Sequence, residues 1–257
     1  MGQEVKELLT VALPAVVLDS LLFAKHDVRR LEEHMLCVQE QESLRAQLAS
    51  KGLLVFIADG SLLPRVSADC ALRKRNSRPF KSSEHLRVEL TSIKGGTISG
   101  MGIPKGITVL VGHSQHGKSM ILEAVAHGIY NHVPGDGREF VVTEPTAVKI
   151  CAQARVVTNV DIAPFFTECP GDGGIVHRAN GRVSGSIAMA VNIQEALELS
   201  SRLLLIDEDE SVSDLLCDNP TALLNRQQLI TPLICKARCL LARHGTSTII
   251  VRCGLDN

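Results

Sequence analysis

The stretch ITVLVGHSQHGKSMILEAV, residues 107–125, joins three kinds of local pattern. Its first six residues are apolar or β-branched and end at a glycine, which is typical of a buried strand. Its last part is an apolar run without Gly or Pro, which predicts a helix. Between them, GHSQHGKS fits G-x-x-x-x-G-K-[ST] at every fixed position: Gly112, Gly117, Lys118 and Ser119. A strand, a Gly-containing loop and a helix in this order predict a loop that wraps phosphate groups, rather than a chance Gly-rich turn.

Each fixed position of this loop has a physical reason. Gly112 and Gly117 are expected to allow backbone conformations that a Cβ would block, so that consecutive N–H groups point inward. Lys118 places a charge beside the β- and γ-phosphates of a nucleoside triphosphate, and Ser119 offers a hydroxyl to Mg²⁺. The two histidines at variable loop positions are interpreted as loop fillers rather than catalysts. The predicted nucleotide contacts are Gly112, His113, Ser114, Gln115, His116, Gly117, Lys118, Ser119 and Met120.

A second motif, LLLIDED at residues 203–209, supplies carboxylates. Its apolar residues predict a buried strand with Asp207 at the carboxyl end, where ligands bind in open α/β sheets. Asp207 is therefore the candidate Mg²⁺ ligand, directly or through water. Glu208 is the candidate general base, or the residue that positions the attacking water. Alone, an acidic strand end is weak evidence; paired with the upstream loop it indicates a nucleotide site.

A third segment begins with Ser184, Gly185 and Ser186, ahead of a predicted helix. A small hydroxylated turn at a helix start can bind an anion. It can equally be a plain N-cap, and the residues themselves leave both interpretations open.

The composition indicates an ordinary globular protein without strong overall charge. The chain has 257 residues, a formal net charge of −1 and 3% aromatic residues, so neither a whole-molecule attraction to nucleic acid nor a base-stacking platform is expected. Of the scattered cysteines only Cys235 and Cys239 are close, and no second Cys or His pair completes a zinc site. We therefore expect no structural zinc. We also expect a reduced, intracellular protein, cytoplasmic in the first instance, with mitochondrial and nuclear locations left open.

The apolar segment Leu8–Ala24 contains Pro14 and Asp19 and is short for a membrane span. It is predicted to be an amphipathic helix packed on the protein, so no membrane partner is expected.

The order of the elements predicts an α/β fold with a mainly parallel sheet and additional antiparallel strands. A helix is predicted over 27–50 and a buried strand over 53–58, followed by later strands at 86–90, 107–112, 139–143, 203–207 and 247–251 and helices near 187–200 and 229–244. The Gly-rich run at 95–106 is predicted to form turns between short strands. The basic segment 73–81 is interpreted as a surface linker, with an RNA or DNA contact as the alternative. The predicted division is an N-terminal region, 1–80, and a nucleotide-binding domain, 81–257.

These motifs resemble the predicted ATPases of the ABC class, a family of soluble P-loop proteins. The resemblance is carried by GMGIPKGITVLVGHSQHGKS, GIYNHVPGDGREFVVTEPTAVKI, NIQEALE and LLLIDEDES, together with LPAVVLDSLLF and GLLVFIADGSLLPR upstream. It implies a P-loop NTPase fold with an ABC-ATPase-like core, ATP and Mg²⁺ as ligands, hydrolysis of ATP, and a homodimer with sites at its interface. It also implies that Ser184 to Ser186 reach nucleotide bound to a second copy. The loop NHVPGDGR, residues 131–138, matches as well and is interpreted as a structural turn.

The chain departs from the family at its ends. It starts inside the usual N-terminal region and stops just after the strand at 247–251, so an exposed apolar sheet edge is expected. Two functions therefore stay open: an ATPase, and a module in which ATP drives dimerisation or binding to RNA or protein with little turnover.

Overall fold

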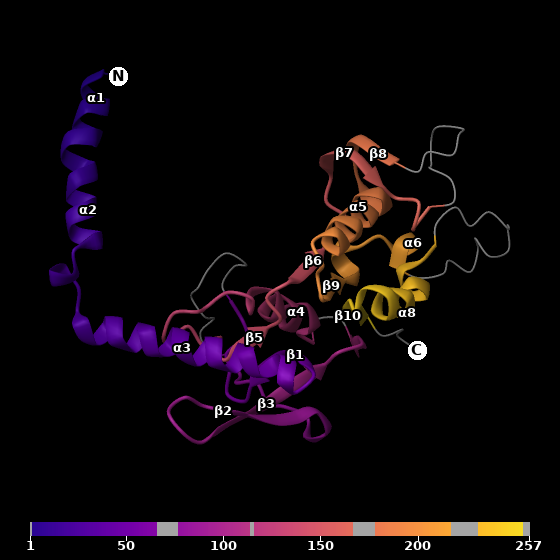
Figure 1. Ribbon diagram of the computed structural model, residues 1–257, viewed down its shortest axis with the longest axis horizontal. Helices are drawn as coiled ribbons and strands as arrows, with labels where there is room; N and C mark the ends of the chain where they lie inside the picture. Colours follow the sequence, from indigo (N-terminus) through magenta and orange to yellow (C-terminus); the bar gives the residue numbers. More distant parts are fainter. Residues whose placement is uncertain (1, 66–76, 114–115, 167–177, 217–230, 254–257) are drawn as a thin grey trace.

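The computed structural model describes residues 2–65, 77–113, 116–166, 178–216 and 231–253, which form two four-stranded sheets, a two-stranded sheet and surrounding helices (Figure 1). The antiparallel sheet has the order β2-β3-β1-β5, with β1 (Leu53–Ala58), β2 (Arg87–Thr91), β3 (Thr97–Pro104) and β5 (Val141–Thr143). The parallel sheet has the order β4-β10-β9-β6, with β4 (Ile107–Gly112), β6 (Ala147–Ile150), β9 (Leu203–Asp207) and β10 (Ser247–Cys253). The small sheet pairs β7 (Arg155–Asp161) with β8 (Arg178–Val183).

The helices fall into an N-terminal group and a group around the parallel sheet. The first group comprises α1 (Gly2–Glu7), the π-helical turn η1 (Leu8–Ala12), α2 (Leu13–Leu21), the 3-10 turn η2 (Phe23–Lys25) and α3 (Val28–Ser50). The second comprises α4 (Lys118–His127), α5 (Gly185–Glu198), the 3-10 turn η4 (Glu208–Glu210), α6 (Ser213–Leu216) and α8 (Leu233–His244), and a further 3-10 turn, η3 (Glu84–Leu86), precedes β2. The fold is thus α/β, with mixed parallel and antiparallel sheets and a helical N-terminal region, as predicted.

Helix α3 covers the antiparallel sheet. It begins where the Asp27 carboxylate accepts a hydrogen bond from the Arg29 N–H at 3.0 Å, because this bond satisfies one of the unpaired donors of the first turn. Its second half buries Leu44 and Leu48 in a cluster with Phe56 of β1. This packing, rather than the charged first half, holds the helix on the sheet.

The Gly-rich run has the predicted turns at its ends, at residues 93–96 and 105–106, but residues 97–104 form one continuous strand, so the prediction of turns was wrong there. β3 pairs with β2 over residues 97–101 and with β1 over residues 100–104. A Cβ at Gly100 would overlap the Ile57 carbonyl oxygen, and one at Gly102 would lie 2.8 Å from a methyl group of Val88. These glycines are needed for close packing across the sheet, which local sequence does not reveal.

Strand alternation divides the core between the two faces of the parallel sheet. Leu203 and Leu205 of β9 pack in the cluster that contains the buried side of α4. The intervening Leu204 and Ile206 pack in the cluster that contains α5 and α8. Asp207 continues the odd-numbered series, so its side chain lies on the α4 side of the sheet.

The predicted packing of the N-terminal helix was also wrong. Residues 2–25, which we call the arm, contain no buried residue, and the arm stands away from the rest of the protein (Figure 1). In the described part of the chain, no helix is long and apolar enough to cross a membrane.

Two further sequence expectations concern the domain boundary and the sheet edge. The boundary at residues 80 and 81 remains a prediction, and β1 from the first region pairs with β3 and β5 from the second, so both regions share a sheet. The expected apolar edge is present at β4, an edge strand whose Ile107, Val109 and Val111 side chains are exposed.

Candidate nucleotide-binding site

The loop predicted to bind phosphate connects β4 to α4. Gly117 is the N-cap of α4 and has a φ of 80°, a left-handed conformation that favours glycine. The first turn of α4 leaves backbone N–H groups unpaired at the positive end of the helix dipole. Gly112 has no left-handed φ, and a Cβ there would lie 3.6 Å from Cδ of Lys118, an ordinary contact. The prediction that the backbone conformation requires glycine is therefore confirmed at Gly117 and is wrong at Gly112. Ser114 and Gln115 lie outside the described residues.

The Lys118 ammonium group is held by the loop itself. Nζ donates hydrogen bonds to the carbonyl oxygens of Gly112 at 2.6 Å and of His113 at 2.7 Å, and lies 3.9 Å from Sγ of Cys253. The imidazole rings of His113 and His116 pack edge to face, with centroids 5.4 Å apart. The Lys118 ammonium group is thus held beside the loop by two neutral carbonyl oxygens. Phosphate oxygens could take the place of these two acceptors.

Asp207 is buried at the end of β9, and only 2% of its surface is exposed. Its Oδ1 accepts a hydrogen bond from the Asp209 N–H at 3.2 Å, and its carbonyl oxygen accepts one from the Ser211 hydroxyl. Asp207 is the N-cap of the η4 turn. Its carboxylate is therefore held by a backbone N–H of that turn as well as by its position at the end of β9.

Glu208 contacts the end of β10. Its Oε2 accepts a hydrogen bond from the Cys253 N–H at 2.7 Å, and its Oε1 lies 3.6 Å from Nε of Arg252. Sequence reasoning missed both partners. They occur near Glu208 because β10 lies between β4 and β9, so that all three strands end on the same side of the sheet.

A cavity of about 330 Å³ lies between the loop and the acidic strand end. It brings together two motifs that are far apart in sequence, and it also takes residues from the end of β10. It is lined by Gly117, Lys118, Ser119, Met120, Asp207, Glu208, Asp209, Val251 and Cys253. The predicted residues His113 and His116 and the segment 184–186 are not among those that line it.

The lining of this cavity fits a phosphate-bound Mg²⁺ ion. Mg²⁺ takes oxygen ligands and usually retains several waters, with one or two protein ligands and the phosphates of its substrate. The Ser119 hydroxyl and the Asp207 carboxylate are suitable oxygens, and Lys118 adds a cation for phosphate. Among the described residues, no group of three His, Cys, Asp or Glu side chains could hold a metal ion.

An ion-pair network links the elements around the cavity. Nζ of Lys149, on β6, lies 2.9 Å from Glu123 of α4 and 2.9 Å from Glu210 of η4, and Glu123 also contacts His127 at 2.9 Å. Burial alone would raise the pKa of Glu123, but Lys149 and His127 hold it below its ordinary value. Burial alone would lower the pKa of Lys149, but the two carboxylates raise it. The helix that carries Lys118 and the acidic turn are thus joined through one lysine.

The segment Ser184–Ser186 lies at the start of α5. Ser184 is the N-cap residue, but its side chain makes no capping hydrogen bond. Gly185 has a φ of 57°, and its N–H donates to the Ala152 carbonyl oxygen at 3.3 Å. The hydroxyl of Ser184 is therefore not used as a cap, which removes one argument for the plain N-cap interpretation.

The loop at 131–138 is built around a buried ionic cluster. The Asp136 carboxylate lies 2.7 Å from Arg65 and 2.8 Å from Nδ1 of His132. Burial lowers the pKa of Arg138 to about 10, and its guanidinium donates to the Leu63 carbonyl oxygen. These contacts join the loop to residues 62–65 and do not reach the cavity, which agrees with a structural turn.

Comparison with known proteins places the chain in a family. A family model described as ABC_ATPase, P-loop domain, matches residues 27–257. An uncharacterized protein of Methanocaldococcus jannaschii is 34% identical over 185 residues, which cover 68% of this chain and 41% of that protein. The chain therefore spans less than half the length of this relative. Because the family match includes both the loop and the acidic strand end, the chain belongs to the ABC_ATPase family of P-loop domains.

Proposed function

We propose that this chain binds ATP with Mg²⁺ in the cavity between α4 and the end of β9, and hydrolyses ATP there. One observation carries the proposal: Lys118 and Ser119 at the start of α4 line the same cavity as Asp207 and Glu208. Membership of a P-loop ATPase family supports nucleotide binding at the level of the family.

The residues around the cavity have separate tasks. Lys118 exchanges its two carbonyl contacts for phosphate oxygens, which form stronger, charge-assisted hydrogen bonds. Ser119 and Asp207 hold Mg²⁺, which when bound offsets the charge of the phosphates and of the acidic turn. The backbone N–H groups at the start of α4 add donors for phosphate.

Glu208 accepts the proton of the attacking water or positions that water. Its two contacts with β10 leave lone pairs of both carboxylate oxygens available, so the side chain can accept a further hydrogen bond without moving far. The same contacts hold the side chain beside the end of β10, where it lines the cavity.

Ser184 to Ser186 belong to this proposal only through a second copy. They do not line the cavity of their own chain, so their contact with nucleotide requires a dimer in which each copy presents α5 to the other's site. Nucleotide-dependent mass by light scattering tests this step separately.

The experiment measures the melting temperature of the purified chain with and without Mg-ATP, and then phosphate release. A ligand that binds only the folded state raises the melting temperature. Lys118→Ala should weaken ATP binding about tenfold or more, because it removes charge-assisted contacts worth about 1.5–3 kcal/mol each. Lys105→Ala is the matched control, since Lys105 is an exposed lysine in the turn between β3 and β4 that makes no ion pair within the described residues.

Glu208→Gln separates binding from turnover. The variant should keep the melting shift with Mg-ATP and lose phosphate release. If it releases phosphate at the parent rate, the assignment of Glu208 is wrong. If the parent binds Mg-ATP and releases no phosphate, with or without added RNA, the chain is a nucleotide-dependent binding module instead of an ATPase.

A further inference from the structure

Lys149 lies on the same face of the parallel sheet as Asp207. Lys149 of β6 is paired in register with Leu205 of β9, and Asp207 is the next residue of β9 on that face. The earlier positions on this face, Ala147 of β6 and Leu203 and Leu205 of β9, pack in or against the apolar cluster that contains the buried side of α4. Two neighbouring strands therefore change from apolar to charged side chains towards their carboxyl ends, with a cation on one strand and a carboxylate on the other.

The Lys149 ammonium group bridges the two elements that carry the candidate site. Its Nζ lies 2.9 Å from Oε2 of Glu123 and 2.9 Å from Oε1 of Glu210. Glu123 is four residues after Ser119, so both side chains lie on one face of α4 in successive turns. Glu210 ends the η4 turn that begins at Glu208. One lysine therefore joins the helix of the predicted phosphate-binding loop to the acidic turn.

Backbone contacts hold the other sides of these elements. The Ala152 N–H, just after β6, donates a hydrogen bond to the Glu210 carbonyl oxygen at 3.0 Å, so β6 holds the η4 turn through backbone as well as through Lys149. The Thr143 hydroxyl of β5 donates to the Val125 carbonyl oxygen at 2.7 Å, near the end of α4. The lysine contacts α4 nearer to the phosphate-binding loop than this bond does, and is thus well placed to control where the helix begins.

Removal of the ammonium group would leave two carboxylates facing each other. The oxygens of Glu123 and Glu210 that contact Nζ lie within about 6 Å of each other, a range in which like charges repel. Asp207, Glu208 and Asp209 precede Glu210 without a break, so the turn is already crowded with negative charge. Lys149 therefore replaces a repulsion between α4 and η4 by an attraction.

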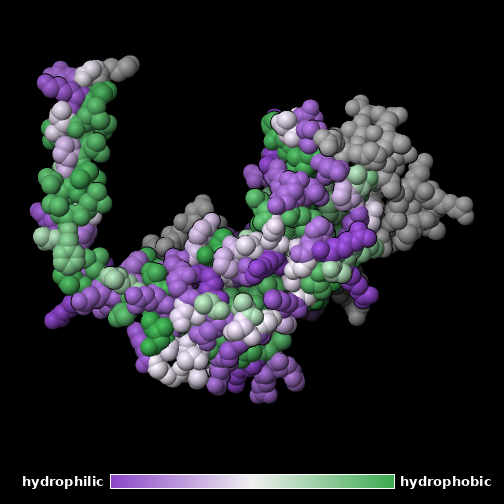
Figure 2. All heavy atoms as spheres, viewed as in Figure 1, coloured by the Kyte–Doolittle hydropathy of each residue, from purple (hydrophilic) through white to green (hydrophobic). Residues whose placement is uncertain are grey.

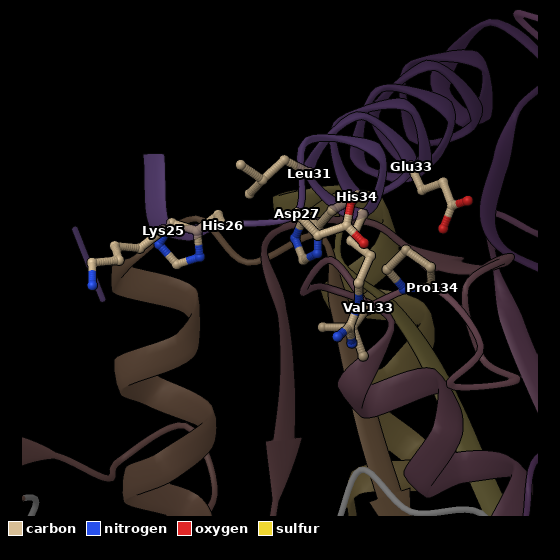
Figure 3. Close-up of a pocket in the computed structure, with 9 residues that line it drawn as sticks. Lys25, His26, Asp27, Leu31, Glu33, His34, Val133 and Pro134 are labelled. Carbon is tan, nitrogen blue, oxygen red and sulfur yellow. The ribbon is translucent and has the colours of Figure 1, made fainter. Parts of the chain in front are cut away.

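The charged side chains at the elbow, where the arm meets α3, are paired more locally. They line a cavity of about 840 Å³ (Figure 3). Lys25 lies 3.6 Å from Asp19, and the Asp27 carboxylate caps α3. The large apolar side chains of the adjoining arm are exposed along its length (Figure 2). The contacts at the elbow join residues close in sequence, whereas Lys149 joins three elements far apart in sequence, two of which line the nucleotide cavity.

We propose that Lys149 is a positioning residue of the nucleotide site, which sets the separation between Ser119 and Asp207 and thereby the place of Mg²⁺ relative to Glu208. This inference rests on the proposed function. Lys149 is not among the residues that line the cavity, so it acts through its two carboxylate partners and touches neither phosphate nor metal.

The test is a titration of Mg²⁺ at a fixed, saturating ATP concentration, read as the melting temperature of the full chain. Lys149→Met should raise the Mg²⁺ concentration of the half-maximal shift about tenfold, because residues that orient metal ligands affect metal affinity on this scale. At saturating Mg²⁺ the half-maximal ATP concentration should change less than about twofold, since Lys118 is intact, while phosphate release falls. This split would not follow from a general loss of stability.

Arg155→Met is the matched control. The Arg155 guanidinium contacts Glu195 and Asn192 of α5 at 2.6 Å, and its side chain is 39% exposed, comparable with Lys149. Its loss therefore removes a doubly bonded cation from elements other than α4 and η4. The Mg²⁺ midpoint of Arg155→Met should equal that of the parent.

A second substitution tests whether repulsion is the cause. Glu210→Gln alone should raise the Mg²⁺ midpoint only about threefold, because it removes one attraction and creates no repulsion. Added to Lys149→Met, it should bring the tenfold loss back to about threefold, whereas a packing role for the lysine stem predicts no recovery. Glu210→Gln also carries the test if Lys149→Met does not fold, since the Glu210 side chain is 48% exposed.

The outcomes separate this inference from the proposed function. A parent chain whose melting temperature does not respond to Mg-ATP overturns the proposed function, and the role of Lys149 with it. A parent that responds, together with a Lys149→Met or Glu210→Gln variant of parental Mg²⁺ midpoint, overturns the role of Lys149 alone. A double variant no better than Lys149→Met also overturns it. A parent that binds Mg-ATP without releasing phosphate leaves the Mg²⁺ midpoints as the deciding measurement.

Discussion

Replacing Lys149 by methionine removes the cation that joins α4, β6 and η4 while keeping an unbranched apolar stem. The side chains of Lys149, Glu123 and Glu210 are 27%, 26% and 48% exposed. Solvent-exposed ion pairs contribute about 0–1 kcal/mol, and charge-assisted hydrogen bonds away from water about 1.5–3 kcal/mol. The contact with Glu123 should therefore contribute about 1–1.5 kcal/mol and the more exposed contact with Glu210 about 0.5 kcal/mol. We expect Lys149→Met to lower the free energy of unfolding by about 1.5–2 kcal/mol.

The pH dependence of this loss follows from the two pKa shifts. The pKa of Glu123 is lowered in the folded protein from an ordinary value of 4.5, so its contribution is present above that value and disappears as the pH falls through the lower, folded pKa. The pKa of Lys149 is raised from an ordinary value of 10.5, so its contribution is present below that value and disappears as the pH rises through the higher, folded pKa. The difference in stability between parent and variant should be largest from about pH 5 to pH 10 and smaller on both sides.

Urea unfolding followed by circular dichroism measures the difference at each pH. Combined with Glu123→Gln and the double variant, it gives a coupling energy, which we expect to be about 1 kcal/mol at pH 7. Lys105→Met, which changes an exposed lysine without an ion pair among the described residues, should alter stability by less than about 0.5 kcal/mol. A coupling energy near zero, or a loss that does not change between pH 7 and pH 3, would refute the assignment of an interacting pair.

Three further changes test the packing on which the site rests, each by urea unfolding. Gly100→Val should destabilise the protein by about 3 kcal/mol or more, because its Cβ overlaps the Ile57 carbonyl oxygen; a loss below about 1 kcal/mol would show that the strands can separate there. Leu44→Ala should cost about 2–5 kcal/mol, since this side chain of α3 is fully buried against the antiparallel sheet. Asp136→Ala should cost about 3–5 kcal/mol by leaving Arg65 buried without its carboxylate, and an unchanged stability would contradict the role given to this cluster.

The elements that could be predicted are those whose local sequence pattern matches the burial of the same residues in the folded protein. The run at 53–58 is apolar throughout and the run at 203–207 is apolar up to Asp207, and both are strands buried along their whole length. The helix predicted over 27–50 is α3, with Asp27 as its cap. The Gly-rich strand β3 could not be predicted, because its glycines are required by close contacts with Ile57 and Val88, which lie on other strands.

The same distinction applies to the candidate site and to the arm. Lys118, Ser119, Asp207 and Glu208 belong to patterns with known chemical use, and the structure brings them to one cavity. Arg252 and Cys253 belong to no such pattern, and only the pairing of β10 between its neighbours places them beside Glu208. The arm shows the opposite error. The apolar segment Leu8–Ala24 is helical over most of its length, as expected, but its apolar character does not determine which surface it packs on.

The position of β10 explains why the cavity exists. Neighbouring strands lie about 4.8 Å apart, so the ends of β4 and β9, which have β10 between them, are separated by roughly 10 Å. That separation leaves space above the end of β10, with the start of α4 on one side and the acidic turn on the other. Val251 and Cys253 line this space, whereas the intervening Arg252 points to the other face, where it lines a second small cavity with Val109 and Ile250. A shift of β10 by one residue would exchange these faces, bringing the arginine into the cavity and removing the Cys253 N–H from Glu208. The geometry of the candidate base thus depends on the register of a strand that carries none of the predicted site residues.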